Sequence, residues 1–227
     1  MAGETGEPET LKTTRGTFPL EDYHLALGGR TWRVLHTGVV LTHADESHFF
    51  REVLLRLPYG VALWPSSIAL AHELAERGPE LQGRSLLELG SGTGLPGIVA
   101  ASLGARVTQT DRHELAMAVC QRNGERNGVG GIEHALVDWT EWRDERRYDW
   151  IIGSDILYGD AMHPHLARIF ESRLAPGGRV LLADPLRAPS LKFLEQLQGS
   201  GWSVAMSKWT LGDETPRVFG VFELTPP

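Results

Sequence analysis

One segment constrains the fold of this 227-residue chain more than any other: Leu86-Leu87-Glu88-Leu89-Gly90-Ser91-Gly92-Thr93-Gly94-Leu95-Pro96-Gly97. An apolar run of strand length leads into three alternating glycines. Pro96 follows them, and proline favours the first turn of a helix. A strand, a glycine loop and a helix in this order are typical of α/β proteins that bind a nucleotide-like ligand at the end of the strand. The alternative is a tight strand-to-helix turn without a ligand.

The spacing of the glycines discriminates between ligands. The dinucleotide fingerprint is G-x-G-x-x-G, whereas this loop has G-x-G-x-G, with Leu95 where the third glycine of the fingerprint would stand. Glu88 lies two residues before Gly90, where its negative charge would repel a pyrophosphate. S-adenosylmethionine has no phosphate and carries an ammonium and a sulfonium group. The loop therefore favours S-adenosylmethionine over a nicotinamide dinucleotide.

Downstream of Gly83, short apolar runs alternate with segments of helical period. The expected strands are Ser85–Leu89, Arg106–Thr110, Ile132–Val137, Tyr148–Gly153, Arg179–Ala183, Trp202–Trp209 and Arg217–Leu224. The expected helices are Gly97–Leu103, Glu114–Arg126, Pro164–Leu174 and Ser190–Gln198. This alternation predicts an α/β fold whose mostly parallel sheet is covered by helices on both faces. Only Thr210–Pro216 joins the last two strands, which is too short for a helical crossover, so we expect an antiparallel last strand.

The region upstream of Gly83 has a different pattern. Residues 1–16 offer little to bury and predict a flexible tail. Phe18–His43 holds β-favouring segments on either side of Gly28 and Gly29, which predicts a small hairpin. A helix is expected over Ser66–Arg77. The predicted organisation is a tail at 1–16, a hairpin and helix packed on the core at 17–82, and a cofactor-binding core at 83–227.

The composition of the chain limits the classes of molecule that it is expected to bind. The chain has 22 Lys and Arg against 29 Asp and Glu, a formal net charge of −7, so it lacks the basic excess that nucleic-acid binding uses. Basic partners are favoured instead. The apolar runs are far shorter than the ~20 residues of a membrane helix, and the start of the chain lacks a basic signal segment. We expect a cytoplasmic protein that binds no membrane, with Cys120 as a buried structural thiol.

Acidic residues end three of the predicted strands. Asp111 follows the second strand about 20 residues after the glycine loop, where such folds place a carboxylate on ribose hydroxyls. The alternative role for Asp111 is an N-cap of the next helix. Asp138 and Trp139 end the third strand, where they could bond and stack on an adenine, although Trp139 could equally belong to the core.

At the end of the fourth strand stands Ser154-Asp155-Ile156-Leu157-Tyr158. Asp155 and Tyr158 would both face a transferred methyl group, because such folds bind ligands at the carboxyl edge of the sheet. His163-Pro164-His165 is not accompanied by a cluster of cysteines or carboxylates, so no metal site is expected.

From Pro58 to Leu224 the sequence resembles the seven-β-strand methyltransferases, whose fold is Rossmann-like, and among them the family-16 protein lysine methyltransferases. The motifs that carry the resemblance are Leu63-Trp64-Pro65-Ser66, the glycine loop, Asp111, Asp138-Trp139 and the D-x-x-Y sequence Asp155-Ile156-Leu157-Tyr158. By this resemblance, the cofactor contacts are Trp64, Glu88, Gly90, Gly92, Gly94, Asp111, Asp138, Trp139 and Ser154. Asp155 and Tyr158 would lie at the substrate amine.

The resemblance implies an S-adenosylmethionine-dependent N-methyltransferase whose acceptor is a lysine side chain of a protein. Protein arginine methylation and methylation of a small-molecule amine or pyridine stay open. A nucleobase methylase would more typically carry Asn/Asp-Pro-Pro-Tyr where this chain has its D-x-x-Y sequence. A non-catalytic module that retains the cofactor fold is a further alternative.

Overall fold

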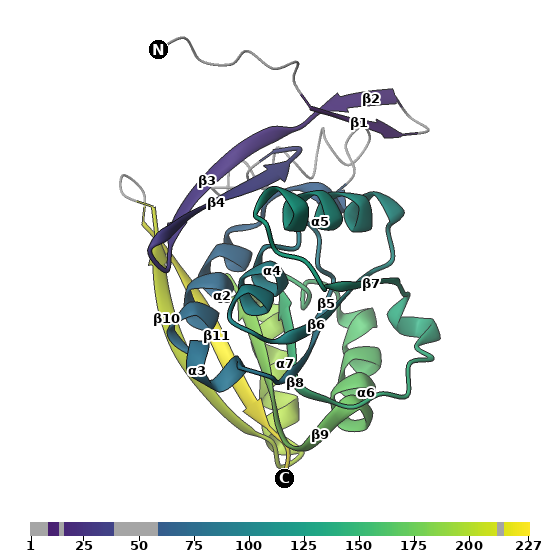
Figure 1. The fold of residues 1–227 in the computed structure, drawn as a ribbon. Helices are drawn as coiled ribbons and strands as arrows, with labels where there is room; N and C mark the ends of the chain where they lie inside the picture. Colours follow the sequence, from purple (N-terminus) through teal and green to yellow (C-terminus); the bar gives the residue numbers. More distant parts are fainter. Residues whose placement is uncertain (1–8, 14–15, 39–58, 213–215) are drawn as a thin grey trace.

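The computed structural model of the chain describes residues 9–13, 16–38, 59–212 and 216–227 (Figure 1). Most of the predicted tail, and residues 39–43 of the predicted hairpin region, lie outside the described residues. No helix in the described ranges combines the length and the apolar character that crossing a bilayer requires.

A seven-stranded sheet forms the centre of the molecule. Its strands are β5 (Ser85–Leu89), β6 (Arg106–Asp111), β7 (Glu133–Leu136), β8 (Tyr148–Ser154), β9 (Leu174–Asp184), β10 (Ser203–Leu211) and β11 (Arg217–Thr225). They are arranged in the order β10-β11-β9-β8-β5-β6-β7. Neighbouring strands from β9 to β7 are parallel, and β11 is antiparallel to both β9 and β10. The predicted mostly parallel sheet with an antiparallel last strand is confirmed.

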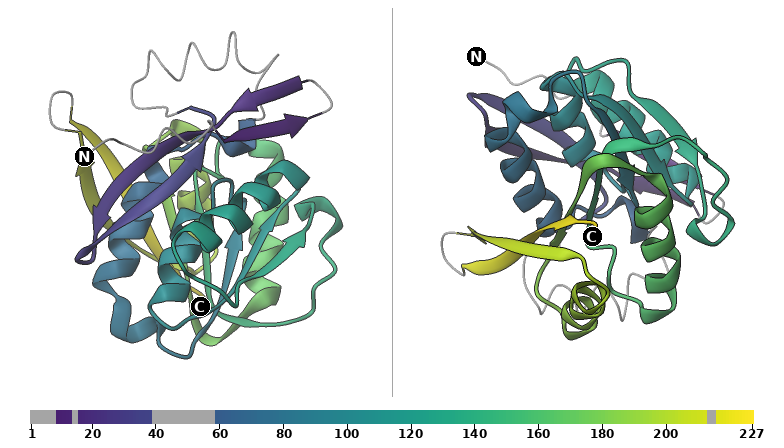
Figure 2. Two further views of the ribbon diagram at one scale, coloured as in Figure 1. Left: turned by 45° about the horizontal axis from the view of Figure 1, so that its top comes forward. Right: turned by 90° about the horizontal axis from the view of Figure 1, so that it is seen from below.

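Helices cover both faces of this sheet (Figures 1 and 2). They are α2 (Pro65–Glu76), α3 (Gly78–Leu81), α4 (Leu95–Ser102), α5 (Glu114–Arg126), α6 (His163–Arg173) and α7 (Ala188–Gly199). Successive residues of β5 are buried on opposite faces: Leu86 packs with α2 and α4, whereas Leu87 packs with α6 and α7. Burial on both faces explains why the strands read as continuous apolar runs rather than as alternating ones.

Two hairpins precede the sheet. Strands β3 (Glu21–Leu27) and β4 (Arg30–His36) pair through a two-residue turn, as predicted. Both turn residues, Gly28 and Gly29, have positive φ (62° and 76°), which glycine adopts without steric cost. A further antiparallel pair, β1 (Thr10–Thr13) and β2 (Gly16–Pro19), begins within the segment that the sequence predicted as tail. Strand β1 is anchored by Leu11, which is 2% exposed and packs in a small apolar cluster.

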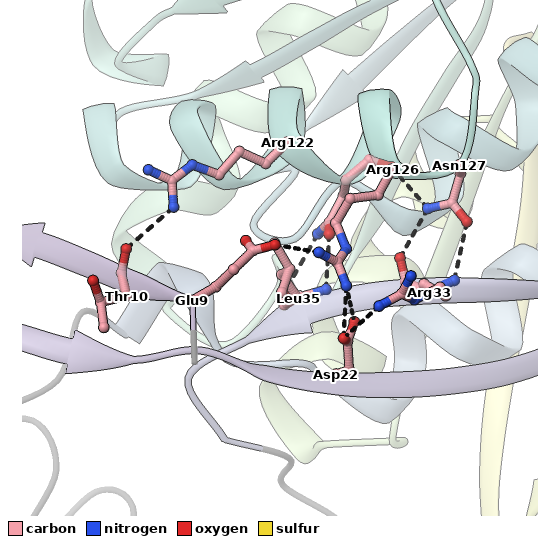
Figure 3. A network of polar contacts seen from close by, with 9 residues as sticks. Glu9, Thr10, Asp22, Arg33, Leu35, Arg122, Arg126 and Asn127 are labelled. Carbon is pink, nitrogen blue, oxygen red and sulfur yellow. Dashed lines mark hydrogen bonds and ion pairs between the residues drawn. The ribbon is translucent and has the colours of Figure 1, made fainter. Parts of the chain in front are cut away.

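The hairpin β3–β4 is held against α5 by polar contacts (Figure 3). The side-chain amide of Asn127 accepts from the backbone N–H of Arg33 at 3.0 Å and donates to its carbonyl at 2.8 Å, as a neighbouring strand would. The guanidinium of Arg126 binds both carboxylate oxygens of Asp22 and also pairs with Glu9. The N-terminal hairpins and the core are therefore joined by specific bonds as well as by apolar packing.

Candidate active site

A cavity of about 330 Å³ lies at the carboxyl ends of the parallel strands. It opens where the strand order reverses between β5 and β8, the position at which open α/β sheets bind ligands. Its volume falls within the ~300–1,000 Å³ of small-molecule pockets. The described residues that line it are Gly60, Trp64, Gly90, Gly92, Asp111, Arg112, His113, Val137, Asp138, Trp139, Ser154, Asp155, Ile156, Tyr158 and Met162. All the site residues predicted from the sequence are among them except Glu88 and Gly94.

The glycine loop forms one wall of the cavity. Gly90 has φ of 63°, and a Cβ at this position would lie 2.9 Å from Ile156 Cγ2 and 3.2 Å from the Trp139 ring. A Cβ on Gly92, φ 54°, would lie 3.1 Å from the carbonyl oxygen of Gly60. A side chain at either position would displace these walls. The loop therefore presents bare backbone to the cavity, which is what close approach to a ligand requires.

Glu88 and Gly94 lie behind this loop. Gln109 Nε2 donates to Glu88 Oε2 at 2.7 Å and to the Gly94 carbonyl at 2.8 Å, so one buried amide connects the strand and the loop. Burial raises the pKa of Glu88 to about 8. A Cβ on Gly94 would lie 2.9 Å from Cys120 Sγ, and that thiol is buried and donates to the Gly92 carbonyl. These residues shape the loop from its far side, and a direct cofactor contact by Glu88 or Gly94 stays a prediction.

Asp111 joins the loop to the second strand. It is only 7% exposed, and burial raises its pKa. Its Oδ2 accepts from the backbone N–H of Gly92 at 3.2 Å, and its Oδ1 accepts from that of His113 at 2.9 Å. Asp111 thus closes the turn before α5, whose N-cap is His113, and it also lines the cavity, while its contact with ribose stays a prediction. Each oxygen retains a lone pair that could accept from a ribose hydroxyl.

Asp138 and Trp139 form the wall beyond Asp111. Asp138 Oδ1 accepts from the backbone N–H of Thr140 at 2.9 Å and from its hydroxyl at 2.7 Å. These bonds lower the pKa of Asp138, so it is a carboxylate at neutral pH. Trp139 packs one edge against Gly90 and against the core between the sheet and α6, while it also lines the cavity. Trp139 is both a core residue and a flat surface available to a ligand.

The opposite end of the cavity is formed by Trp64, Ser154, Asp155 and Tyr158. Asp155 follows β8 directly, is 8% exposed and has φ of 54°. Its carboxylate pairs with the guanidinium of Arg187, Nη1 to Oδ1 2.5 Å. Tyr158 is 47% exposed at the rim. Burial raises the pKa of Asp155. The structure therefore places a buried carboxyl group and an exposed phenol at one cavity, and their contact with an acceptor stays a prediction.

Sequence reasoning missed several residues that line the cavity and one residue, Arg187, that contacts the lining residue Asp155. Arg112, His113, Val137 and Ile156 lie within two positions of predicted residues, and that proximity was an available signal. Gly60 and Met162 lie in connections with no ligand motif. Arg187 lies in the connection between β9 and α7, and it had no local signal, because its role depends on a contact with a residue 32 positions earlier.

The cavity suits S-adenosylmethionine. Bare glycine backbone lines one wall, two carboxylates lie where ribose and adenine could be bound, and a further carboxylate lies at the far end. No cluster of basic side chains suited to a pyrophosphate is present on the described lining, where Arg112 is the one Lys or Arg. Fold and cavity together define a nucleoside-binding α/β protein of the methyltransferase class.

Comparison with known proteins identifies the family. Residues 50–200 match the model of the lysine methyltransferase family, and the chain belongs to this family. Family and fold make S-adenosylmethionine the cofactor, as the glycine spacing predicted.

The named relatives of the chain are protein methyltransferases. The chain is 36% identical over 137 residues to the protein N-lysine methyltransferase METTL21A of Xenopus tropicalis, which covers 58% of this chain and 63% of the relative. It is 31% identical over 168 residues to the histone-arginine methyltransferase METTL23 of Xenopus laevis, covering 70% and 67%. The chain thus spans less than two thirds of the METTL21A relative.

The fold recurs among solved structures. The glycopeptide N-methyltransferase MtfA, in a complex with S-adenosylmethionine, superposes with a TM-score of 0.60 at 16% identity, covering 71% of this chain and 94% of that protein. The predicted Rossmann-like methyltransferase fold is confirmed by this likeness.

Proposed function

We propose that this protein is an S-adenosylmethionine-dependent N-methyltransferase that methylates a lysine side chain of another protein. One observation carries the proposal: the glycine loop, the carboxylates of Asp111 and Asp138 and the pair Asp155 and Tyr158 all line a single cavity. The groups proposed to bind the cofactor and those proposed to bind the acceptor therefore line the same cavity. Family membership and the METTL21A relative support lysine as the acceptor.

The chain would hold the cofactor along one wall of the cavity. The backbone at Gly90 and Gly92 would receive the methionine part, Asp111 the ribose, and Asp138 with Trp139 the adenine. When bound, S-adenosylmethionine supplies an electrophilic methyl group, which the acceptor nitrogen takes as the carbon–sulfur bond breaks and its electron pair stays on sulfur. The residues contribute position and a matched electrostatic environment.

Asp155 would orient the acceptor, and Tyr158 would close over it. A free lysine has a pKa near 10.4, so presenting it as a neutral amine at pH 7 costs roughly 4–5 kcal/mol at ~1.36 kcal/mol per pH unit. Burial in the cavity would lower that cost, because burial disfavours the ammonium form. The proton leaves to solvent before attack. The net charge of −7 would attract a basic protein segment.

Arginine is the second candidate acceptor. The METTL23 relative, which is named as a histone-arginine methyltransferase, covers more of this chain than the METTL21A relative does. A planar guanidinium needs a wider opening than an ammonium on a flexible stem. Identification of the methylated residue in the product distinguishes the two acceptors.

The test uses the full chain and radiolabelled S-adenosylmethionine in a cell lysate separated into protein, RNA and small-molecule fractions. Mass spectrometry then identifies the methylated residues. We expect label on lysine of protein, and far less of it with the Asp155→Asn variant. Label on arginine alone, or in the small-molecule fraction alone, would contradict lysine methylation and leave methyltransfer standing.

The cytoplasmic location stays a prediction, which imaging of a tagged chain would test.

A further inference from the structure

Asp155 is held in an unusual backbone conformation. Asp155 and Leu186 are the two non-glycine residues with positive φ in the described part of the chain, at 54° and 66°. Both lie at the carboxyl edge of the sheet, and the backbone N–H of Asp155 donates to the carbonyl of Ala183 at 2.9 Å. Strained residues of this kind persist where their surroundings determine the conformation, and they cluster at functional sites. The segments that carry them are joined by this backbone bond and also by the side chain of Arg187, which pairs with Asp155.

Arg187 binds two carboxylates. Its Nη1 lies 2.5 Å from Asp155 Oδ1 and 3.4 Å from Asp184 Oδ2, and its backbone N–H donates to Asp184 Oδ1 at 2.8 Å. Asp184 is fully buried and also accepts from the Ser190 hydroxyl at 2.7 Å. Asp184 therefore anchors the backbone of Arg187, and the guanidinium extends from this anchor to Asp155.

The guanidinium reaches Asp155 from outside the cavity. Among the described residues, Asp155 belongs to the cavity lining and Arg187 does not. Arg187 Nη1 engages Oδ1 of this carboxylate. The arrangement leaves Asp155 able to orient an acceptor while a cation behind it offsets part of its charge.

This offset matters for the proposed reaction. An isolated carboxylate would favour the ammonium form of an acceptor amine and so would oppose the loss of the proton that must precede attack. We propose that Arg187 is a positioning residue that fixes the carboxylate of Asp155 and offsets its charge, so that the acceptor amine is oriented without being held protonated. The inference rests on the proposed N-methyltransferase function.

Other groups around Asp155 do not replace Arg187. Ser66 of α2 lies close enough to lower the pKa of Asp155, while burial and the charge of Asp184 both raise it, and burial is the largest effect. Among the lining residues that the structure describes, the other charged or titratable groups are Asp111, Arg112, His113, Asp138 and Tyr158. Without Arg187, the pKa of Asp155 would rise and any carboxylate that remained would hold the acceptor proton more firmly. Both effects move the pH range in which methyl transfer is fast to higher pH.

The experiment compares Arg187→Met, which removes the charge, with Arg187→Lys, which retains it. Arg179→Met is the matched control. Arg179 lies on β9, the strand that Arg187 follows, and it likewise pairs with two carboxylates, Glu80 and Glu223, but away from the cavity. The rate of transfer from labelled S-adenosylmethionine into the protein fraction is measured from pH 6 to 10. In parallel, carboxyl NMR of ¹³C-aspartate-labelled protein follows the titration of Asp155, with Asp155→Asn identifying its signal.

We expect Arg187→Met to move the acidic limb of the pH–rate profile upward by about one to three pH units, since an opposite charge at this distance shifts a pKa by that amount. Arg187→Lys should recover most of this shift, and Arg179→Met should leave the profile unchanged. An unchanged profile in Arg187→Met, or equal loss of transfer in the Met and Lys variants at all pH values, would overturn the inference. If the wild type labels no protein, the proposed function fails. The role of Arg187 is then decided by the NMR titration alone, and an Asp155 pKa that is unaltered in Arg187→Met overturns it.

Discussion

The side-chain carbonyl of Asn123 accepts a hydrogen bond from the backbone N–H of Leu35 at 2.7 Å, although 88 residues separate them in the sequence. The same amide donates to the carbonyl of Leu35 at 3.1 Å and to the carbonyl of Thr93 in the glycine loop at 2.8 Å. Leu35 lies on the strand of the hairpin that Figure 3 shows against α5. One buried side chain therefore connects the N-terminal hairpin to the loop that lines the cofactor cavity.

Replacing Asn123 with alanine should weaken both connections. Three buried hydrogen bonds are lost, each worth about 0.5–1.5 kcal/mol, so we expect the free energy of unfolding to fall by about 2–4 kcal/mol. Cofactor affinity should fall as well, because the Thr93 carbonyl loses its partner. Urea unfolding and calorimetric titration with S-adenosylmethionine would measure the two effects. Gln121→Ala on the same helix is the control, since that side chain is exposed, and a matching result for the two variants would contradict the prediction.

Removing the carboxylate of Asp111 should weaken cofactor binding by about tenfold or more. Charge-assisted hydrogen bonds contribute roughly 1.5–3 kcal/mol, and ~1.4 kcal/mol corresponds to a factor of ten. Asp111→Ala is compared with Asp149→Ala in calorimetric titrations. Asp149 accepts from Ser85 at the opposite end of the sheet, so its loss should leave affinity unchanged. Equal affinity of wild type and a folded Asp111→Ala would refute the placement of ribose at this residue.

Asp155→Asn should reduce methyl transfer more than it reduces cofactor affinity. The substitution keeps the shape of the side chain and removes the charge that would orient the acceptor, so we expect about a tenfold or greater loss of kcat/KM for the protein acceptor. Affinity for S-adenosylmethionine should change by less than about twofold. Parallel losses of transfer and of cofactor affinity would instead place Asp155 on the cofactor.

The local signals in the sequence predicted the centre of the sheet well because β5 and β8 are short, largely apolar runs bounded by glycine or polar residues. Ser85–Leu89 and Glu114–Arg126 match β5 and α5 at both ends. The lining acids could also be predicted, because parallel strands bring their carboxyl ends to one edge. The strand β1 was harder to predict, since the buried side chain of Leu11 lies within a polar segment.

Contacts between distant segments could not be predicted. Asn123, Gln109 and Arg187 carry no motif, and each acquires its role from a partner at least 15 residues away in the chain. Glu88 shows the same limit: its position before Gly90 indicates an acidic group near the ligand, but only the fold shows that its carboxyl group bonds Gln109 behind the loop, and its contact with the cofactor stays a prediction. The strand end is a local property, but the direction of a side chain there depends on what packs against it.

The buried carboxyl of Glu88 should make the stability of the cofactor-free protein depend on pH. Burial raises its pKa from 4.5 to about 8, so between these values the folded protein holds a proton that the unfolded chain has lost. Stability therefore decreases as pH rises through this range, with a slope of up to about 1.4 kcal/mol per pH unit from this group. Glu88→Gln, which cannot ionise, should lack this contribution.

Urea unfolding at pH 5.5, 6.5 and 7.5 would measure the difference in unfolding free energy between wild type and Glu88→Gln. We expect the difference to move steadily in favour of the glutamine variant as pH rises, because only the wild type must either keep a proton or bury a charge. Glu133→Gln is the control: Glu133 is exposed and paired with Arg146, which lowers its pKa, so it is ionised in both states throughout this range. A difference between wild type and Glu88→Gln that stays constant with pH would show that Glu88 is already ionised in the folded protein, and hence that solvent or a cation reaches it behind the glycine loop.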